Sequence, residues 1–396
     1  MRIVFDLALI WLVYVYAGYP IALAITALWW RVRPRSPNRE ILPSVSVLIA
    51  ARNEEKDIRW KISETLAWDY PPDKLKLLIA SDASDDNTDE IVRRLAGPRL
   101  TFIRMERRSG KVRALNRLAE ITTSDLLFFT DANAHIPPHA LRLMVRHFAD
   151  PRVGCVTGDS RSVARGEEQA LASTVGLYRR YESMLRRLES RIGSVLVCDG
   201  AIFCMRSSLF HRLCPDFAND LETPMRAAAE GYYITYEPRA VVLERDTSSP
   251  LEEFKRQRRM CAQGMAAMLN LRGTFGGIRG WQFVSHKLLR WLSVIPMIAL
   301  LGSSAVLARD SAFLDTALIG QIVFYAVAAV GLLQSARGRP VARPLSIPFY
   351  IMLGLIAAQV GVLDALSGKR FDVWEIPASS RGHSDSGLLG AEEQWP

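Results

Sequence analysis

The stretch Leu126-Leu-Phe-Phe-Thr-Asp-Ala-Asn-Ala-His-Ile136 carries most of the information about the fold. Apolar residues of strand-forming type end at Thr130, and Asp131 and Asn133 follow directly. Ligands of open α/β sheets bind outside the carboxyl ends of the strands, so Asp131 is predicted to lie at a ligand-binding position. An Asp-x-Asn pair there can bind a divalent cation together with phosphate oxygens. The same residues also favour an ordinary turn, and this segment alone does not choose between them.

Strand-like and helix-like patterns alternate from residue 44 to residue 270, which is typical of an α/β domain. Short apolar runs with β-branched and aromatic residues predict strands, whereas longer amphipathic stretches predict helices. The predicted strands are 45–51, 75–80, 126–129 and 194–198, and the predicted helices are 54–66, 88–95, 138–148 and 170–191.

Long apolar runs flank this domain. Residues 3–30 contain one charge, Asp6, and can span a hydrocarbon core of about 30 Å. Trp29-Trp30 and the following arginines favour an interface anchor with a cytoplasmic flank. We therefore expect a transmembrane helix at 1–33, a linker at 34–43 and a cytoplasmic domain at 44–270. An interfacial amphipathic helix at 271–290, about three spans within 291–367 (runs 291–308, 311–334 and 344–366) and a polar tail at 368–396 would follow.

Charge and cysteine content narrow the class of partner. The chain has 50 Lys and Arg against 41 Asp and Glu, a net charge of +9. This excess suits a lipid bilayer with anionic headgroups and phosphorylated substrates. No nucleic-acid recognition module is present, so we expect no nucleic-acid partner. The five cysteines form no Cys-x-x-Cys pair, which argues against structural zinc.

Further polar segments stand at the expected ends of strands and starts of helices. Asp82 follows a predicted strand and can accept hydrogen bonds from a base or ribose. Gly110-Lys111 opens a helix within a basic loop, which fits either phosphate binding or a solvated turn. Asp220 opens another helix, either as a simple N-cap or as a general base. Asp199-Gly200 is either a tight turn or part of the acceptor side.

In this order and spacing, the segments resemble the family 2 glycosyltransferases, the membrane-anchored inverting enzymes that include cellulose-synthase-like and hyaluronan-synthase-like proteins. The resemblance covers residues 43–269. It implies a GT-A fold, an α/β domain with a mixed, mainly parallel sheet, flanked here by transmembrane helices. It also implies a nucleotide-diphosphate sugar as donor, with a UDP-sugar the first candidate, and Mg²⁺ or Mn²⁺ as cofactor.

The resemblance assigns roles to single residues. Asp220 matches the catalytic base, and Asp131 with Asn133 matches the Asp-x-Asp metal motif. The first strand and its loop match a nucleotide-binding segment, and the Gly-Lys-x-x-Ala-x-Asn segment is also present. Together with Asp199 from the turn described above, the predicted substrate-binding residues are Ala51, Asn53, Glu54, Asp82, Lys111, Asn116, Asp199, Arg256 and Arg259.

Two departures from the family pattern are visible. Asn133 replaces the second aspartate, which removes a negative charge and predicts weaker metal binding. In the register that places Arg259-Met260 over the Arg-Trp of processive members, Arg256 stands where Gln is expected. Because methionine offers no flat face on which a sugar ring can stack, this argues against processive polymerisation.

We therefore expect an inverting transfer of sugar to a lipid or glycan acceptor at the cytoplasmic face of a bacterial inner membrane. The pathway would be exopolysaccharide or cell-envelope glycan synthesis, with polysaccharide assembly proteins as candidate partners. The alternative is a catalytically idle, nucleotide-binding membrane subunit that organises such an assembly complex. The joint presence of Asp82, Asp131 and Asp220 argues against that alternative.

Overall fold

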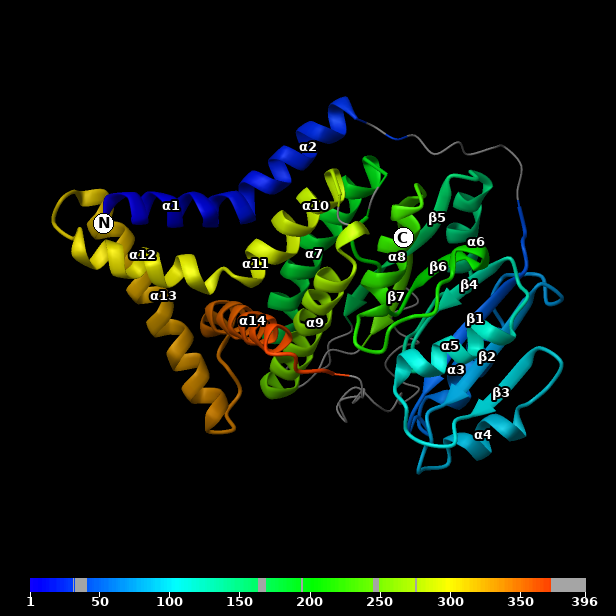
Figure 1. The fold of residues 1–396 in the computed structure, drawn as a ribbon. Coiled ribbons are helices and arrows are strands. Elements are labelled where there is room, and N and C mark those ends of the chain that lie inside the picture. Colours follow the sequence, from blue (N-terminus) through cyan, green and yellow to red (C-terminus); the bar gives the residue numbers. More distant parts are fainter. Residues whose placement is uncertain are drawn as a thin grey trace. The chain divides into compact units, whose positions relative to one another are not determined.

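The computed structural model describes residues 1–30, 32, 41–162, 169–193, 195–244, 249–274 and 276–371. Most of the predicted linker and of the predicted polar tail lies outside these residues. The chain divides into two compact units, each shown in Figure 1. The sheet unit comprises Val32–Val163, Gly193–Asp246 and Asp372–Pro396, and the helical unit comprises Met1–Arg31, Ala164–Ile192 and Thr247–Phe371.

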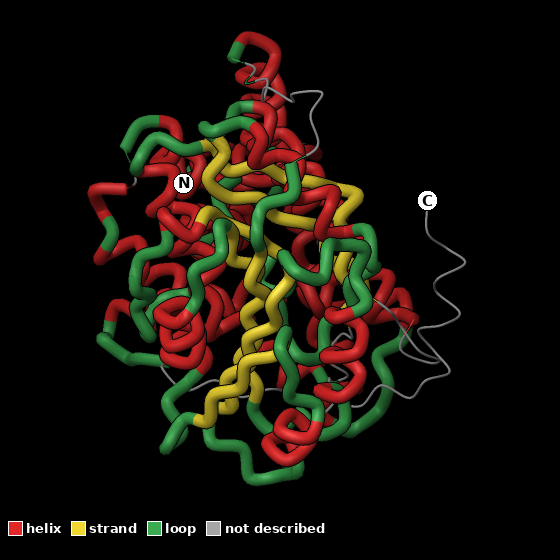
Figure 2. The backbone as a smooth tube through the Cα atoms, turned by 90° about the vertical axis from the view of Figure 1, so that its right-hand side faces the viewer, coloured by secondary structure: helices red, strands yellow, loops and turns green. Residues whose placement is uncertain are grey.

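A seven-stranded sheet forms the centre of the sheet unit, in the order β3-β2-β1-β4-β6-β5-β7 (yellow in Figure 2). Most neighbours are parallel, but β6 runs antiparallel to both β4 and β5. The sheet is therefore mixed and mainly parallel, as expected. Its strands are β1 (Val45–Ala51), β2 (Leu75–Ser81), β3 (Leu100–Arg104), β4 (Leu126–Phe129), β5 (Val153–Ser162), β6 (Phe203–Arg206) and β7 (Tyr233–Glu244).

Helices cover both faces of this sheet. Every residue of β1 is buried, and its side chains alternate between two cores: Val47 belongs to one and Leu48 to the other. A strand buried on both faces is nearly continuously apolar rather than alternating. β1 fits this pattern with one polar residue, Ser46. The first core includes residues of α3 (Ile58–Leu66), α4 (Thr88–Arg94) and α6 (Ala140–Val145), and the second includes residues of α5 (Lys111–Ile121) and α8 (Asn219–Ala229).

Most predicted elements of the sheet unit form with small shifts at their ends. β1 and β4 have the predicted bounds, whereas α3 begins only at Ile58, four residues later than expected. The predicted strand at 194–198 is wrong over its described residues. Val195 donates its amide to the Ile234 carbonyl and Cys198 donates to the Asp220 carbonyl. These single bonds to different partners replace the continuous ladder of a strand.

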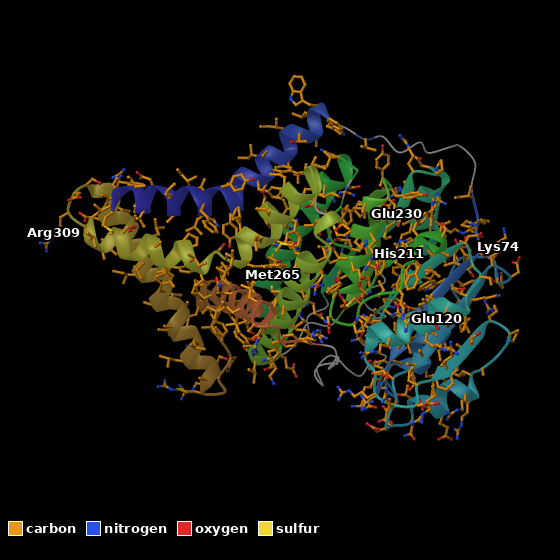
Figure 3. The ribbon with its side chains drawn as sticks, viewed as in Figure 1. Lys74, Glu120, His211, Glu230, Met265 and Arg309 are labelled. Atoms are coloured by element: carbon orange, nitrogen blue, oxygen red, sulfur yellow. The ribbon has the colours of Figure 1, made fainter. Side chains whose placement is uncertain are left out.

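Strand order creates a switch point at one edge of the sheet. From β1 the chain proceeds to β2 and β3 on one side, then returns to β4 on the other side. Such reversals are where open α/β sheets bind ligands, beyond the carboxyl ends of the strands. Because β6 is antiparallel to β4, the start of β6 lies at this same edge. Lys74, labelled in Figure 3, precedes β2 and so marks the opposite edge, where it donates to the Leu42 carbonyl (2.7 Å).

The helical unit contains the apolar segments. A continuous helix is formed by α1 (Arg2–Val13), a π-helical turn (Tyr14–Gly18) and α2 (Tyr19–Trp29). Two further helices of this unit come from later in the chain. α7 (Gln169–Arg191) lies in sequence between segments of the sheet unit, and α9 (Pro250–Asn270) follows them. The unit also contains α10 (Ile278–Phe283), a π-helical segment (Val284–Leu288), α11 (Leu289–Trp291), α12 (Val294–Val306), α13 (Ala312–Ala336) and α14 (Arg343–Leu366).

Three helices among the described residues are long and apolar enough to cross a membrane: Arg2–Trp29, Ala312–Ala336 and Arg343–Leu366. The predicted span at 291–308 is not one straight helix. α12 has 13 residues and therefore rises about 20 Å, short of a core of about 30 Å. It reaches span length only together with Ile278–Trp291, from which it is bent by 58°. The preceding segment, predicted as interfacial, is thus helical and bent against α12.

We predict that the protein stays with the membrane fraction in high salt and at alkaline pH, and that only detergent releases it. Large apolar side chains are exposed along α13, among them Phe313 (59%) and Ile319 (61%). Salt screens surface charge but does not weaken burial in hydrocarbon. Sedimentation of membranes after each treatment is the measurement, and release by salt alone would contradict a spanning helix.

Candidate functional site

The loops after β1 and β2 are held together at the switch-point edge. Asn53 has a positive φ of 55°, which asparagine tolerates better than most residues. Its side-chain oxygen accepts the amide of Asp85 (2.9 Å), and its own amide donates to Ser84 Oγ (3.1 Å). Arg52 donates to the carbonyls of Asp82 (2.7 Å) and Ala83 (2.6 Å). Arg52 was not predicted, although it lies within the loop that the sequence singled out.

Asp82 holds the Gly-Lys turn in place. Its carboxylate is buried, and its two oxygens accept the amides of Ser109 (2.6 Å) and Gly110 (2.9 Å). Gly110 has a φ of 92°, in the region that only glycine adopts without strain. Asp82 therefore fixes the loop from which Lys111 projects, and its contact with a nucleotide stays a prediction.

An ion pair joins the start of α5 to the end of β4. Lys111, the first residue of α5, pairs through its ammonium with the carboxylate of Asp131. Both side chains remain partly exposed, 16% for Lys111 and 20% for Asp131. Two segments that the sequence predicted separately, the phosphate-binding loop and the metal-binding pair, thus meet at one point that a solute can reach.

A buried lysine contacts the backbone of the segment that follows Asp131. Lys61 on α3 is fully buried, and its ammonium donates to the Ala134 carbonyl (2.5 Å) and to Glu64 (3.2 Å). Burial lowers the pKa of Lys61, while the charges of Glu64 and Asp131 partly offset that effect. Sequence reasoning missed Lys61, because a lysine in a helix gives no sign that it will be buried.

His135 has a structural role. Its Nδ1 lies 2.5 Å from the Glu64 carboxylate, and its ring packs on Trp60 with centroids 5.1 Å apart. The same Glu64 carboxylate accepts the amide of Ile136 (2.9 Å). Together with Lys61, these contacts fix the backbone that follows Asp131 and Asn133.

Asn116 serves the packing of the domain. It is buried, its amide nitrogen donates to the Leu213 carbonyl (2.9 Å), and its oxygen accepts the Leu213 amide (2.8 Å). Because the side chain is engaged with the backbone in both directions, these bonds account for an asparagine here without any substrate. Its predicted substrate contact therefore stays a prediction, and its structural role is what the geometry shows.

We predict that Asn116→Ala lowers the free energy of unfolding by about 1–3 kcal/mol, because it leaves two buried backbone groups without their partner. Nucleotide affinity of the folded protein should stay within twofold of wild type. The matched control is Asn270→Ala, whose exposed amide donates within its own helix (2.8 Å). Thermal unfolding in detergent and nucleotide titration measure the two effects, and a loss of affinity without destabilisation would support the predicted substrate contact instead.

Asp220 is not the N-cap of α8. The helix begins at Asn219, its capping position is Ala218, and no side chain caps it. Asp220 instead lies in the first turn of the helix. Its backbone carbonyl accepts the amide of Cys198 (2.9 Å), which ties α8 to the segment before β6.

Asp199-Gly200 lies beside this carboxylate. Asp199 donates its amide to Thr157 Oγ1 (2.8 Å), and its carbonyl accepts the amide of Ile202 (3.1 Å), so the segment is a tight turn. A β-carbon added at Gly200 would stand 3.5 Å from Oδ2 of Asp220. The turn interpretation is therefore confirmed, and the turn also borders the candidate base.

The sheet unit thus contains most of the predicted site residues. Ala51 is the last residue of β1. Those that follow β1, β2 and β4 or open α5 are Asn53, Glu54, Asp82, Lys111, Asp131 and Asn133, and those near β6 and α8 are Asp199 and Asp220. Arg256 and Arg259 lie on α9 in the helical unit. The Arg256 guanidinium pairs with Glu253 one turn earlier (2.8 and 2.9 Å).

The donor atoms at Asp131 fit a metal that is bound jointly with substrate. Among the described residues, no group of three or more His, Cys, Asp and Glu side chains could hold a metal ion. Asp131 and Asn133 offer one carboxylate and one amide oxygen. Mg²⁺ is commonly held by one or two carboxylates plus substrate phosphates, so this set suits such a cation once phosphate is present.

The three-layer fold, with acids and a basic loop at its switch point, defines a GT-A-type domain. Residues 46–213 match the family described as Glycosyl transferase family 2, so this part of the chain is similar to that family.

Several curated proteins are similar to parts of this chain. A "Beta-monoglucosyldiacylglycerol synthase" of Synechocystis sp. is 34% identical over 29% of this chain and 25% of that protein. "Probable glycosyltransferase YdaM" of Bacillus subtilis is 27% identical over 57% and 56%. A "Poly-beta-1,6-N-acetyl-D-glucosamine synthase" of Staphylococcus epidermidis is 26% identical over 50% and 48%. The chain thus spans between about a quarter and somewhat over half the length of these relatives.

Among the solved structures similar to this chain is one that matches most of its length. It is "Mannosyltransferase PcManGT from Pyrobaculum calidifontis in complex with GDP-Man and Mn2+". The likeness covers 93% of this chain and 100% of that one, with a TM-score of 0.67 and 24% sequence identity. At this identity the likeness establishes the fold, which is the GT-A fold that the sequence predicted.

Proposed function

We propose that this protein is an inverting glycosyltransferase that moves a sugar from a nucleotide-diphosphate sugar to a lipid or glycan acceptor. The observation that carries the proposal is the Lys111–Asp131 ion pair at the switch point of a family 2 glycosyltransferase domain. It supplies a cation and a carboxylate at the place where a diphosphate would bind. A UDP-sugar is the first candidate donor, and the GDP-Man of the similar solved structure makes a GDP-sugar the second.

Lys111 would exchange one anionic partner for another during the reaction. Its ammonium now pairs with Asp131, and a bound diphosphate offers it a partner of higher charge. Amides at the start of α5 favour the same anion, because helix N-termini bind phosphate. Groups placed where negative charge develops stabilise the transition state, so Lys111 lowers the barrier to departure of the nucleoside diphosphate. Arg256 and Arg259 are proposed as additional cations for the donor.

Asp131 and Asn133 are the residues that would hold Mg²⁺ or Mn²⁺. When bound, the cation would supply Lewis-acid stabilisation of the leaving diphosphate. Because Asn133 is neutral, the binding strength would come mainly from the donor phosphates and Asp131. The Mn²⁺ in the similar solved structure supports a divalent cation, and the choice between Mg²⁺ and Mn²⁺ belongs to experiment.

Asp220 is the proposed general base. It takes the proton of an acceptor hydroxyl while that oxygen forms a bond to the anomeric carbon. The bond from that carbon to the diphosphate oxygen breaks in the same displacement, and the nucleoside diphosphate leaves with the electron pair. A single displacement inverts the anomeric configuration. Gly200 borders this carboxylate, because a β-carbon added there would have its nearest protein atoms in Asp220.

The helical unit and the relatives' names support the proposed acceptor and location. Two relatives are named as a glycolipid synthase and a polysaccharide synthase, which supports a lipid or a glycan as the acceptor class. Helices long enough to span a bilayer would anchor the domain to the cytoplasmic face of a bacterial inner membrane. Exopolysaccharide or cell-envelope glycan synthesis is the proposed pathway, with assembly proteins as candidate partners.

Purified protein in detergent, incubated with radiolabelled nucleotide sugars and a membrane lipid extract, tests the proposal. Labelled lipid or glycan that forms with one donor would support it and would name the sugar. Nucleotide binding without transfer for any donor would instead favour the idle subunit that organises an assembly complex.

We predict that Asp220→Asn lowers turnover by about 10²–10⁴-fold, the usual cost of losing a general base. Nucleotide affinity should be nearly unchanged, because the substitution keeps shape and removes only basicity. Glu230→Gln is the control: it follows α8, and its carboxylate contacts His211 (2.5 Å; Figure 3). Initial rates with the best donor decide, and mutant turnover within threefold of wild type would remove Asp220 from this role.

We predict that excess chelator abolishes transfer and that added Mg²⁺ or Mn²⁺ restores it. Metal affinity should be weak in the apo-protein and should rise when nucleotide is present, because one carboxylate alone binds Mg²⁺ poorly. Asn133→Asp should raise the affinity of the apo-protein by restoring the missing charge. Isothermal titration with and without nucleotide measures both effects, and full activity in chelator would contradict the metal site.

A further inference from the structure

The segment that follows β4 forms a tight turn. The Ala134 amide donates to the Asp131 carbonyl (3.3 Å), the bond that closes a four-residue β-turn. Asp131 and Asn133, the proposed metal ligands, are the first and third residues of this turn. We call residues 131–134 the metal turn. Since a side chain follows the backbone from which it projects, the groups that fix this turn also set the place of both ligand oxygens.

Lys61 holds the last residue of the metal turn. Its ammonium donates to the Ala134 carbonyl (2.5 Å), and its side chain is completely buried. Lysine is almost never fully buried unless it is paired. Its partner is Glu64, about one turn further along α3 (3.2 Å). A buried ion pair therefore lies against the end of the metal turn.

The two residues after the metal turn are fixed as well. His135 exchanges both of its backbone hydrogen bonds with Leu243 of β7 (3.0 and 2.8 Å). The Glu64 carboxylate accepts the amide of Ile136 (2.9 Å) and lies 2.5 Å from Nδ1 of His135. Three consecutive residues are thus each bound to another element of the sheet unit, and the pair of Lys61 with Glu64 supplies two of these attachments.

The charge of Lys61 opposes a metal ion at this place. Burial lowers the pKa of Lys61, and the carboxylates of Glu64 and Asp131 act against that effect, so Lys61 and Asp131 interact electrostatically. A positive charge close to Asp131 repels a divalent cation bound there. Charge alone would therefore make Lys61 an unfavourable neighbour for a metal site, whereas its hydrogen bond to the metal turn favours one.

We infer that Lys61 and Glu64 are positioning residues for the metal turn: they fix the backbone that presents Asp131 and Asn133 to one cation bound with the donor diphosphate. A site that is held in its binding geometry loses less entropy when the ligand binds. This order would offset the charge that is missing at Asn133. The inference rests on the proposed function where it concerns sugar transfer, whereas its claim about metal affinity does not require turnover.

Mn²⁺ affinity separates this role from two simpler ones. If Lys61 acted only through its charge, its removal would raise the affinity. If Lys61 only stabilised the fold, the affinity of the folded protein would stay the same. Loss of a positioning residue should instead weaken Mn²⁺ binding by about 10–100-fold, the usual effect of removing a group that orients a metal ligand.

Titration of the full-length protein in detergent with Mn²⁺ tests the inference, with UDP or GDP present and free Mn²⁺ followed by electron paramagnetic resonance. Lys61→Met keeps an unbranched side chain of similar length and removes the charge and the donor. We expect its Mn²⁺ affinity to fall by about 10–100-fold. A higher affinity or an unchanged one would overturn the inference.

A neutral pair keeps the test decisive if Lys61→Met fails to fold because Glu64 is left uncompensated. Lys61→Met combined with Glu64→Gln removes both charges and keeps an acceptor for the Ile136 amide. Removing one partner of a buried ion pair is strongly destabilising, whereas replacing both is tolerated far better. The double variant should show the same loss, since the Ala134 carbonyl again lacks its donor, and wild-type affinity in this variant would overturn the inference.

Arg206→Met is the matched control. Arg206 is likewise a cation that donates to backbone carbonyls, those of Val153 (2.8 Å) and Phe148 (2.8 Å). It pairs with Leu126 at the start of β4 and so lies at the edge of the sheet opposite to the metal turn. Its loss should lower stability while Mn²⁺ affinity of the folded protein stays at the wild-type value. Equal losses of affinity in the Lys61 and Arg206 variants would overturn the inference.

Transfer measured against Mn²⁺ concentration separates failure of the inference from failure of the proposed function. Lys61→Met should need more Mn²⁺ for its half-maximal rate, and saturating Mn²⁺ should restore most of the turnover. A loss that Mn²⁺ does not restore would contradict a role through the metal turn. Mn²⁺ binding without transfer by wild type would refute the function and leave the affinity test decisive, whereas transfer without Mn²⁺ binding would overturn the inference alone.

Discussion

Parallel pairing of β1 with both β2 and β4 is the constraint on which the candidate site depends. Parallel strands end at the same edge, so the polar residues that follow them are brought together. Asp82 follows β2, and Asp131 follows β4. The α5 helix then starts at that edge, because Asp82 accepts the two amides of the Gly-Lys turn. Lys111 consequently reaches Asp131, and the site acquires both a cation and an acid.

The sequence predicted the sheet well because strands buried on both faces leave a clear mark. The apolar runs of β1 and β4 gave the bounds that the structure shows. The predicted strand at 194–198 was wrong because the run Val195 to Cys198 is apolar for another reason: it packs in the core while its amides bond to separate partners. Periodicity reports burial, and it does not report which backbone groups are paired.

The roles of buried charged residues were the least accessible from sequence. Lys61, Glu182 and Glu189 lie within helices whose patterns suggest solvated surfaces, yet all three are buried. Their partners come from distant parts of the chain, as His286 and Glu189 illustrate. The bend before α12 was hidden in the same way, since hydropathy sums over a window and does not detect a break between two short helices. Tertiary contacts decide these features, and local pattern does not contain them.

The Lys111–Asp131 pair also makes a direct structural test available. Crystals or cryo-EM grids of the protein with a nucleoside diphosphate and Mn²⁺ would show which group takes each partner. We expect an anomalous or density peak for Mn²⁺ bonded to the Asp131 carboxylate, with the Lys111 ammonium moved onto the phosphate oxygens. A nucleotide bound elsewhere, or bound here with the Lys111–Asp131 pair intact and no metal on Asp131, would contradict the assignment of this edge as the donor site.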